Sequence, residues 1–440
     1  MIMYRRLTLI TLGVLVVMVY VAMQYIGFGV LQLRFIDDAD LISNDAMLKA
    51  NISISVHGPY VYVAWYDHAE KRIMLASSRD GGNTYRSSII EYVDDAIING
   101  VVTKGSGVYI VWQSEVDGRY DVFLSRSNDG VSFKSINISD NRGDSTFPVM
   151  DVEGNMVYIA WIDSTDGDTD VLLRISNDGG HTFSETVNIS DNGGDSESVA
   201  LDAEGSSVYI AWHDNSDGVF KVMLRASHDY GRTFSDTIVL SDTTVDSGFV
   251  SMVAEGKDVY VAWMSDTGHD SNSIYLRISN DNGYSFNNAV LISSDSISAP
   301  LLTSDGAFIG LTYIDGRGLR FATIASHGVV SSDDIGIDII DANTITKLVV
   351  DIDGYTTAML VYIDGKDIGE VVYVRGDHIN GFMVRSMAHV YADDVSIALR
   401  GNTVYMAWSS KVCVDDCSRV KIGYHLIVGD EEGFREHKLI

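Results

Sequence analysis

The sequence has little proline, little cysteine and little positive charge. Its 440 residues include 3 prolines and 2 cysteines, and 31 Lys and Arg stand against 61 Asp and Glu, which gives a net charge of −30. A chain this acidic repels a phosphate backbone, so we expect no nucleic-acid partner. Two cysteines cannot form a disulfide framework. The chain is not disordered either, because 46% of its residues are hydrophobic, which is enough for a large core.

The beginning of the chain carries a long apolar run. Residues 7–31 contain no charged side chain, and a helix that crosses a bilayer needs about 20 apolar residues, so we predict a transmembrane signal anchor there. Because Arg5 and Arg6 precede the run, the positive-inside rule places residues 1–6 in the cytoplasm as a short N-terminus. A cleaved signal peptide is the alternative. Both interpretations export residues 46–440, and the first predicts a single-pass protein of the cell membrane.

One short pattern recurs along the rest of the chain. Val61-Tyr-Val-Ala-Trp65 returns five times with small changes, so that all six tryptophans occupy one repeat position. These are Trp65, Trp112, Trp161, Trp212, Trp263 and Trp408. Tyr313 and Tyr362 fall where the two missing tryptophans are expected, and the spacings run from 46 to 51 residues. The sequence therefore contains eight units of about 50 residues.

Each unit has the pattern of four short β-strands. In the third unit the apolar runs cover residues 148–152, 157–161, 171–175 and 186–189, bounded by Gly, Asn, Asp or Ser. Four-stranded units repeated at this spacing are typical of a β-propeller. We therefore predict an all-β propeller of eight four-stranded blades, with seven as the alternative number. A string of separate sandwiches would need linkers between the units, and none is visible.

Residues 32–45 are predicted to be a linker that contains a ring-closing strand. Leu41 to Asp45 resembles the end of a fourth strand, yet it precedes the first full unit. It could pair with the last unit, beside or in place of residues 433–440, and so close the ring. Residues 46–440 then form the propeller.

A second pattern stands between the third and fourth strands of five units. It reads S-x-D-x-G-x-[ST]-[FYW], with a copy one residue shorter in the second unit, and its aspartates are Asp80, Asp129, Asp178, Asp229 and Asp281. A short carboxylate can accept backbone N–H bonds across a tight turn, and glycine takes the left-handed conformation there. We call this the turn motif and predict a structural role for its aspartates.

The turn motif resembles the Asp box, or bacterial neuraminidase repeat, of sialidases and other secreted propellers. Five copies at one repeat position cover roughly residues 45 to 290, and the last three units lack the motif. The resemblance implies a propeller in which these boxes lie away from the catalytic centre.

Sialidase chemistry would require further residues. The resemblance implies an arginine triad, a tyrosine nucleophile paired with a glutamate, and an acid/base aspartate. No Arg-Ile-Pro motif is present, because the prolines are Pro59, Pro148 and Pro300. Arg119, Arg142 and Arg317 lie in predicted loops and are the remaining candidates for a triad. Signatures of zinc proteases, serine hydrolases and phosphate-binding loops are also missing from the sequence.

Aspartates gather on the face opposite the turn motifs. In an antiparallel four-stranded blade, the second-to-third and blade-to-blade connections emerge on one face, which we call the loop face. It receives the aspartates that follow the repeat's Trp or Tyr, namely Asp67, Asp163, Asp214, Asp266, Asp315 and Asp364. They could simply cap turns and keep the protein soluble. Alternatively, they could bind a ligand or a hard cation.

The densest acidic group comprises Asp163, Asp166, Asp168 and Asp170. Calcium takes six to eight oxygen ligands, so this group is a candidate calcium site, although it does not follow the EF-hand register. No other cofactor is expected. Cys413 and Cys417, with three residues between them in the last unit, are predicted to form a local disulfide outside the cell.

The function that these observations favour is a binding or cell-envelope scaffold module. Its expected partners are the membrane, through residues 7–31, and a glycan, an envelope protein or a cation on the propeller. The alternative is a glycoside hydrolase of the sialidase type. Such an enzyme would require the candidate arginines to converge on one pocket.

Overall fold

The computed structural model describes most of the chain after residue 51. The described ranges are 41–42, 52–104, 106–266, 272–306, 308–325, 328–334, 345–353, 356–363, 370–377, 381–389, 391–414, 419–429 and 434–438. All of them belong to one compact body, Ala39–Ile440. The predicted anchor, residues 7–31, lies outside these ranges. Within them no helix is long and apolar enough to cross a membrane.

The strands follow the repeat, four to a unit, and each pairs antiparallel with the next. Units 1 to 4 contain β2 (Ile52–His57), β3 (Tyr60–Asp67), β4 (Arg72–Ser78), β5 (Arg86–Tyr92); β6 (Ile97–Lys104), β7 (Gly107–Val116), β8 (Arg119–Ser127), β9 (Lys134–Asn137); β10 (Ser145–Glu153), β11 (Met156–Asp163), β12 (Asp170–Ser176), β13 (Val187–Asn188); β14 (Ser196–Glu204), β15 (Ser207–Asp214), β16 (Lys221–Ser227) and β17 (Ile238–Val239).

The remaining units continue the same order. Units 5 to 8 contain β18 (Ser247–Glu255), β19 (Asp258–Ser265), β20 (Asn272–Ser279), β21 (Val290–Ser296); β22 (Leu301–Ser304), β23 (Ile309–Asp315), β24 (Gly318–Ala325), β25 (Gly328–Asp334); β26 (Ile345–Asp353), β27 (Thr356–Ile363), β28 (Glu370–Asp377), β29 (Gly381–His389); β30 (Tyr391–Arg400), β31 (Thr403–Val414), β32 (Arg419–Gly429) and β33 (Phe434–Lys438). Units 5 and 6 join in one sheet through the pair Ser296 and Asp315.

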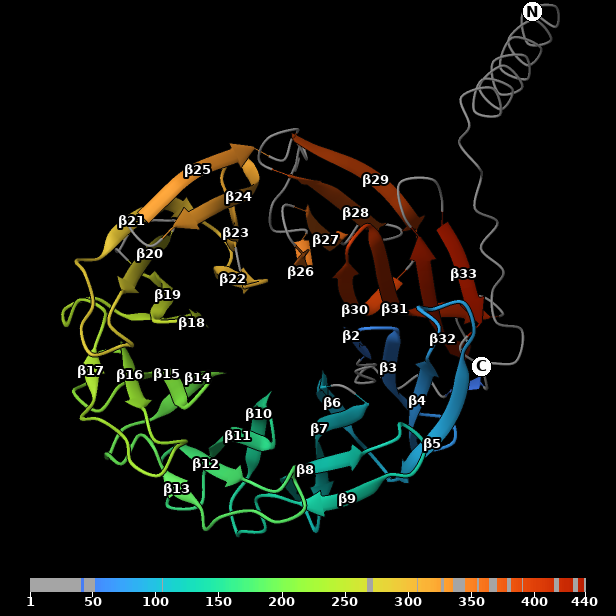
Figure 1. Cartoon of the computed structure of the whole chain (residues 1–440), viewed down its shortest axis with the longest axis horizontal. Coiled ribbons are helices and arrows are strands. Elements are labelled where there is room, and N and C mark those ends of the chain that lie inside the picture. The colour runs from blue at the N-terminus through green and yellow to red at the C-terminus, as the bar shows by residue number, and fades with distance from the viewer. Residues whose placement is uncertain are drawn as a thin grey trace, which may run out of the picture. The chain divides into compact units, whose positions relative to one another are not determined.

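The sheets are arranged around one axis, with the first strand of each unit innermost (Figure 1). This arrangement is that of a β-propeller, as the repeat predicts. Each first strand contacts the next along the chain, from β2 through β6, β10, β14, β18, β22 and β26 to β30. β30 in turn contacts β2, so the series of contacts is cyclic.

The repeat tryptophan belongs to the core between sheets. Trp65, Trp161, Trp212 and Trp408 are fully buried on the second strands of their units. In unit 3 the predicted strands match β10 to β13, although β10 and β11 are longer and β13 is only two residues. Alternation of apolar residues therefore located the strands, while their ends depend on pairing.

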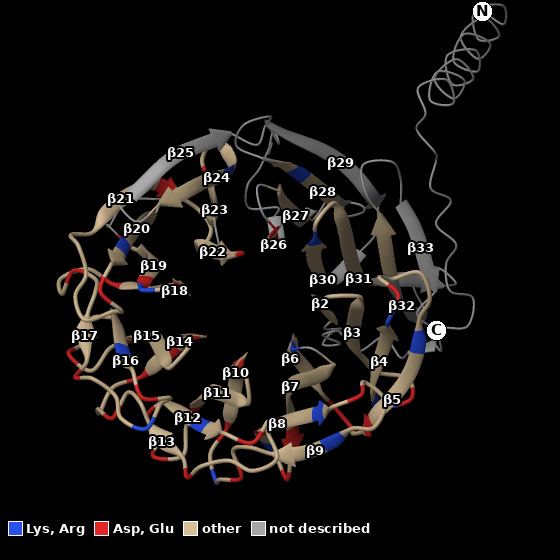
Figure 2. Ribbon diagram, viewed as in Figure 1, with Lys and Arg blue, Asp and Glu red and all other residues tan. Residues whose placement is uncertain are grey.

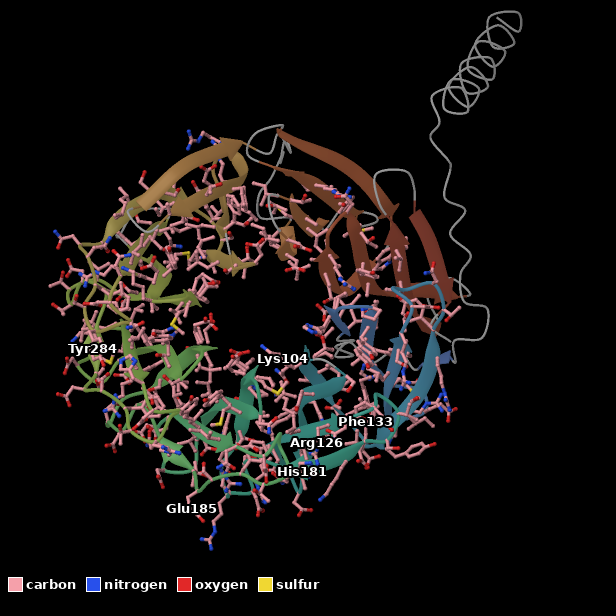
Figure 3. All side chains as sticks on the ribbon, in the orientation of Figure 1. Lys104, Arg126, Phe133, His181, Glu185 and Tyr284 are labelled. Carbon is pink, nitrogen blue, oxygen red and sulfur yellow. The ribbon has the colours of Figure 1, made fainter. Side chains whose placement is uncertain are left out.

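Side chains on the first strands link neighbouring sheets. Asp151 accepts a hydrogen bond from the Ala203 backbone N–H at 2.8 Å. Asp202, one unit later, accepts from the Ala254 N–H at 2.7 Å. Such bonds satisfy backbone donors that face the axis and have no strand partner. Lys104, at the inner end of β6 (Figure 3), forms an ion pair with Glu153 of the next unit at 2.9 Å.

The same kind of bond joins the last unit to the first. The Ile52 N–H donates to Asp394 at 3.0 Å, and the Ile54 N–H donates to Ser396 at 3.1 Å, across 342 residues of sequence. Apolar residues of both units also share one buried cluster, which includes Trp65 and Tyr405. The chain thus closes on itself through side chains of described residues.

The segment predicted to close the ring pairs with the last unit. β1 (Leu41–Ile42) runs antiparallel to β32, with Leu41 opposite Lys421 and Ile42 opposite Val420. β33 pairs with the other end of β32, from His425 to Gly429. Both segments thus pair with β32. That β1 contributes to holding the ring together stays a prediction.

The turn motif forms the hydrogen bonds that its chemistry suggests. Asp80 accepts from the Ser78 hydroxyl at 2.7 Å, the Thr84 hydroxyl at 2.6 Å and the Thr84 N–H at 2.9 Å. These bonds to Thr84 and Ser78 lower the pKa of Asp80 to about 2. Asp129, Asp178, Asp229 and Asp281 accept equivalent bonds.

The glycine of the S-x-D-x-G pattern also packs on the preceding unit. A Cβ at Gly82 would lie 2.9 Å from the Tyr405 ring, and one at Gly231 would lie 3.6 Å from the Tyr158 ring. Arg126 of unit 2 hydrogen-bonds His181 in the turn of unit 3, and the two lie side by side in Figure 3. Each turn therefore contacts the unit before it, which gives the motif a second structural task.

Asp202 makes the stability of the ring depend on pH. Burial and the charge of Asp151 raise the pKa of Asp202 to about 7. An unfolded aspartate loses its proton near pH 4, so between about pH 4 and about pH 7 the folded chain binds more protons and its free energy of unfolding falls as the pH rises.

Asp202→Asn is expected to remove part of this fall, because asparagine does not titrate in this range. The amide oxygen can still accept the hydrogen bond from the Ala254 N–H, so the link between the two units is kept. Melting temperatures of both proteins at about pH 4.5 and about pH 7.5 measure it. An equal loss on raising the pH in wild type and variant would contradict the assignment.

Candidate functional site

The aspartate that follows the repeat tryptophan is buried rather than displayed on the loop face. Asp163 is 2% exposed. It accepts from the Ser145 hydroxyl at 2.6 Å, the Trp161 indole at 3.2 Å and the Thr165 N–H at 3.0 Å. Burial raises the pKa of Asp163, but hydrogen bonds from Ser145, Thr165 and Asn141 lower it by more. The carboxylate therefore stays ionised and fastens its own turn.

Asp214, Asp315 and Asp67 are used in a similar way. Asp214 accepts from Ser196 and Asn192, both at 2.8 Å, and hydrogen bonds hold its pKa below the usual value despite burial. Asp315 accepts from Arg320 at 3.1 Å. Asp67 accepts from Arg72 at 2.9 Å. These carboxylates lock loops, which is the plainer of the two interpretations of the acidic face.

Asp266 does not occupy the equivalent position. Ser265 does, since its hydroxyl lies 2.8 Å from that of Ser247 and accepts from the Trp263 indole at 3.1 Å. Asp266 is exposed one residue later. The sequence pattern placed it one residue out of register because it followed the same tryptophan. Asp364 lies outside the described residues.

The structure gives no support to the predicted calcium site. Asp163 is engaged as above, and Asp170 accepts from the Ser190 hydroxyl at 2.8 Å. Asp166 and Asp168 lie between them in the loop after β11. In the described ranges no group of three or more Asp, Glu, His or Cys side chains could hold a metal ion.

The candidate arginines belong to different parts of the ring. Arg119 begins β8 and lies 3.8 Å from Asp121, whereas Arg317 follows β23 and bonds Asp315 at 3.0 Å. β8 and β23 stand on opposite sides of the ring (Figure 1). Arg142 is exposed in the loop before β10. The three guanidinium groups therefore do not form the triad that a sialidase would require.

The disulfide between the two cysteines stays a prediction. Cys417 lies outside the described residues, and Cys413 is described only as part of β31. A disulfide between them is untested.

A cavity of about 300 Å³ opens on the loop face between units 4 and 5. Glu197, His213 and Phe220 come from unit 4, and Asp246 and Ser247 lie where unit 5 begins. Unit 5 also supplies Gly248, Phe249, Met264, Asp266 and Asn272. We call this the unit 4/5 pocket.

His213 organises the pocket's polar side. It is 6% exposed, and the Phe249 N–H donates to its Nδ1 at 3.3 Å. We therefore assign the ring proton to Nε2, which donates to Glu197 at 3.3 Å. Burial lowers the pKa of His213 and outweighs the hydrogen bond and charge of Glu197, which raise it. A neutral imidazole thus joins the two units at neutral pH.

Phe249 is held in an unusual backbone conformation. Its φ is +53°, and the β-bulge that contains it interrupts the pairing of β18 with β19. A bulky residue at positive φ costs of order 1–3 kcal/mol and often marks a functional site. Gly248 allows the bulge to approach the His213 ring, because a Cβ at this position would lie only 2.9 Å from His213 Nδ1. Phe249 is 56% exposed.

The pocket combines apolar walls with hydrogen-bond acceptors. Phe220 packs edge-on against His213 with ring centroids 5.1 Å apart. Glu197, Asp246 and Asp266 supply carboxylates, and the described residues that line the pocket include neither Lys nor Arg. Asp and Glu residues are spread over many loops of the described ring (Figure 2). A ligand with apolar faces and hydroxyl or amino donors fits this lining, whereas an anionic ligand would be repelled.

Comparisons with known proteins show likeness of fold only. No family model and no curated protein matches the sequence. The polysaccharide lyase Uly1 is 9% identical, with a TM-score of 0.52, and the match covers 81% of this chain and 94% of that chain. A prolyl endopeptidase is 10% identical, with a TM-score of 0.51, over 87% of this chain and 55% of that chain.

A Hadza microbial sialidase is 11% identical, with a TM-score of 0.41, over 72% of this chain and 73% of that chain. The chain is thus an all-β protein of the β-propeller kind, similar in fold to proteins that act on polysaccharides and on peptides.

Proposed function

We propose that this protein is a binding module that captures an uncharged glycan in the unit 4/5 pocket. The observation that carries the proposal is the pairing of exposed aromatic surface with carboxylates and a buried histidine in one pocket. Sugar rings present apolar C–H faces that stack on aromatic rings, and their hydroxyls donate to carboxylates. The lyase's fold is consistent with a role in glycan recognition, but likeness of fold does not assign function.

The surrounding architecture belongs to the same proposal. Eight blades fit the eight repeat units and the cyclic contacts of their first strands. Residues 7–31 would anchor the chain in the cell membrane and place the propeller outside. The glycan would then be a component of the cell envelope or of its surroundings.

A sialidase is a poorer fit to this pocket. Sialic acid carries a carboxylate, and the pocket offers carboxylates in place of arginines. The candidate arginines Arg119 and Arg317 lie on other units, beside aspartates of their own. We therefore propose binding without catalysis.

Phe249→Ala is expected to weaken glycan binding about tenfold or more, because aromatic residues at the centre of a site contribute most of its affinity. The purified full-length chain in detergent is applied to an array of uncharged and acidic glycans. The strongest uncharged ligand is then titrated into wild type and variant.

Tyr284→Ala is the matched control. Tyr284 is 67% exposed and lies in a turn motif at the outer rim (Figure 3), away from the pocket. Equal loss in both variants, or preferential binding of sialylated glycans, would argue against the proposal.

A further inference from the structure

We infer that the binding surface extends along the loop face from Phe249 to Phe147, so that the ligand is a polysaccharide chain lying across units 3 to 5. This inference rests on the proposed function and specifies its substrate class. The evidence is a second aromatic residue built in the same way as Phe249, two units earlier.

Phe147 and Phe249 occupy the same position in their units. Phe147 has φ +51° and lies in the bulge that interrupts the pairing of β10 with β11. Ser145 and Ser247 stand two residues before the two phenylalanines, and each hydroxyl contacts the residue that ends the second strand. Phe147 is 69% exposed. Two aromatic rings are therefore presented from inner strands on the same face.

Each phenylalanine is oriented by a buried side chain of the preceding unit. The Phe147 N–H donates to Gln113 Oε1 at 2.8 Å, as the Phe249 N–H donates to His213. Gln113 is 4% exposed, and both Gln113 and His213 directly follow the repeat tryptophan. Gln113 is thus a positioning residue that holds its bulge, whereas His213 holds the second bulge and also lines the unit 4/5 pocket.

The unit between them leaves room for a ligand. Its equivalent residue is Ser198, which has φ +53° and a small side chain. Ile162 follows the repeat tryptophan of unit 3 and offers no hydrogen bond to that bulge. Unit 4 therefore has the same bulge in its backbone, but Ser198 stands in place of the phenylalanine and Ile162 in place of the residue that accepts its N–H. A large, small, large order of side chains suits a ligand that touches two rings and passes over the serine.

The charge of the surface selects among chains. Glu197 neighbours Ser198 in the sequence and is 58% exposed at its side chain. Asp246 and Asp266 add further carboxylates at the Phe249 end. A nucleic acid, or a glycan rich in carboxylate or sulfate, would be repelled. The ligand class that fits this surface is therefore an uncharged polysaccharide, whose sugar rings would stack on the two phenylalanines.

The test compares ligand lengths by calorimetry on the full-length chain. The probes are di- and hexasaccharides built from glucose, mannose or N-acetylglucosamine. We expect at least one hexasaccharide to bind about tenfold tighter than its disaccharide. Phe147→Ala should remove that gain, whereas Phe249→Ala should weaken the binding of the disaccharide and of the hexasaccharide.

Two further variants separate positioning from folding. Gln113→Leu should reduce the gain with length, and Gln113→Glu, which keeps an acceptor for the Phe147 N–H, should restore it. Tyr230→Ala, at an exposed turn-motif residue, should change nothing. If disaccharides bind but length and Phe147→Ala have no effect, the extended surface is refuted and the pocket stands. If no saccharide binds, or a proline-rich peptide binds instead, both proposals fail.

Discussion

Gly194→Ala is expected to lower the free energy of unfolding by roughly 1–3 kcal/mol, because the new methyl group would collide with backbone. A Cβ at Gly194 would lie 2.3 Å from the Ser216 nitrogen and 2.4 Å from its Cα. Those atoms belong to the loop after β15, and Asp214 fastens that loop by accepting the Ser216 N–H at 2.9 Å. Neither loop can move away without breaking the hydrogen bonds that Asp214 accepts from Asn192 and Ser216.

Gly193→Ala provides the matched control. No atom lies within 4 Å of a Cβ at Gly193, and this neighbouring glycine is exposed. Thermal and urea unfolding of the two variants and wild type measure the difference. Equal stability of the two variants would show that the blade-to-blade loop does not pack on the second-to-third-strand loop.

Asp394→Ala is expected to cost about 2–4 kcal/mol of stability, since it removes a buried acceptor of backbone hydrogen bonds at the junction of the last and first units. Asp394 is 6% exposed and accepts from the N–H groups of Ile52 and Val395, both at 3.0 Å. Without it, the Ile52 N–H would be buried and unpaired. Asp394→Asn keeps an oxygen acceptor and should lose much less.

Chemical denaturation of the three proteins provides the comparison. An Asp394→Ala variant as stable as wild type would contradict the role of this bond in the ring. A large loss in Asp394→Asn as well would show that charge, rather than the acceptor, matters there.

The repeat made most of the fold predictable. Among the residues whose burial is described, seven of the eight units bury one Trp or Tyr on the second strand, so spacing alone located the sheets. The structure of the turn motif was equally predictable, because the Ser78 and Thr84 hydroxyls both donate to Asp80 within seven residues of sequence. Local chemistry of this kind does not depend on distant parts of the chain.

The acidic face was harder to interpret. Composition placed Asp163 and Asp214 on the loop face but could not say that Ser145 and Ser196 would consume their oxygens. A serine begins the first strand in three consecutive units, at Ser145, Ser196 and Ser247, and this recurrence was a usable signal. The error at Asp266 has the same origin, because alignment of whole units would have matched Ser265 with Asp163.

The unit 4/5 pocket was missed altogether. His213 and Phe249 are 36 residues apart and meet only when units 4 and 5 pack together. A comparison of units would have shown that His213 and Gln113 differ from the apolar Ile162 and Met264 at the same position. It would not have shown that bulges expose Phe147 and Phe249, because a positive φ at phenylalanine is set by pairing and not by propensity.

Both binding proposals require the first strands to surround one axis, and hydrogen exchange at Ile52 and Ile54 tests that closure most directly. Their N–H groups donate to Asp394 and Ser396 of the last unit. We predict that both amides are protected in the wild-type chain and that Asp394→Ala speeds exchange at Ile52, 342 residues away in sequence. Rapid exchange of both amides in wild type, unchanged by Asp394→Ala, would mean that the ring is open.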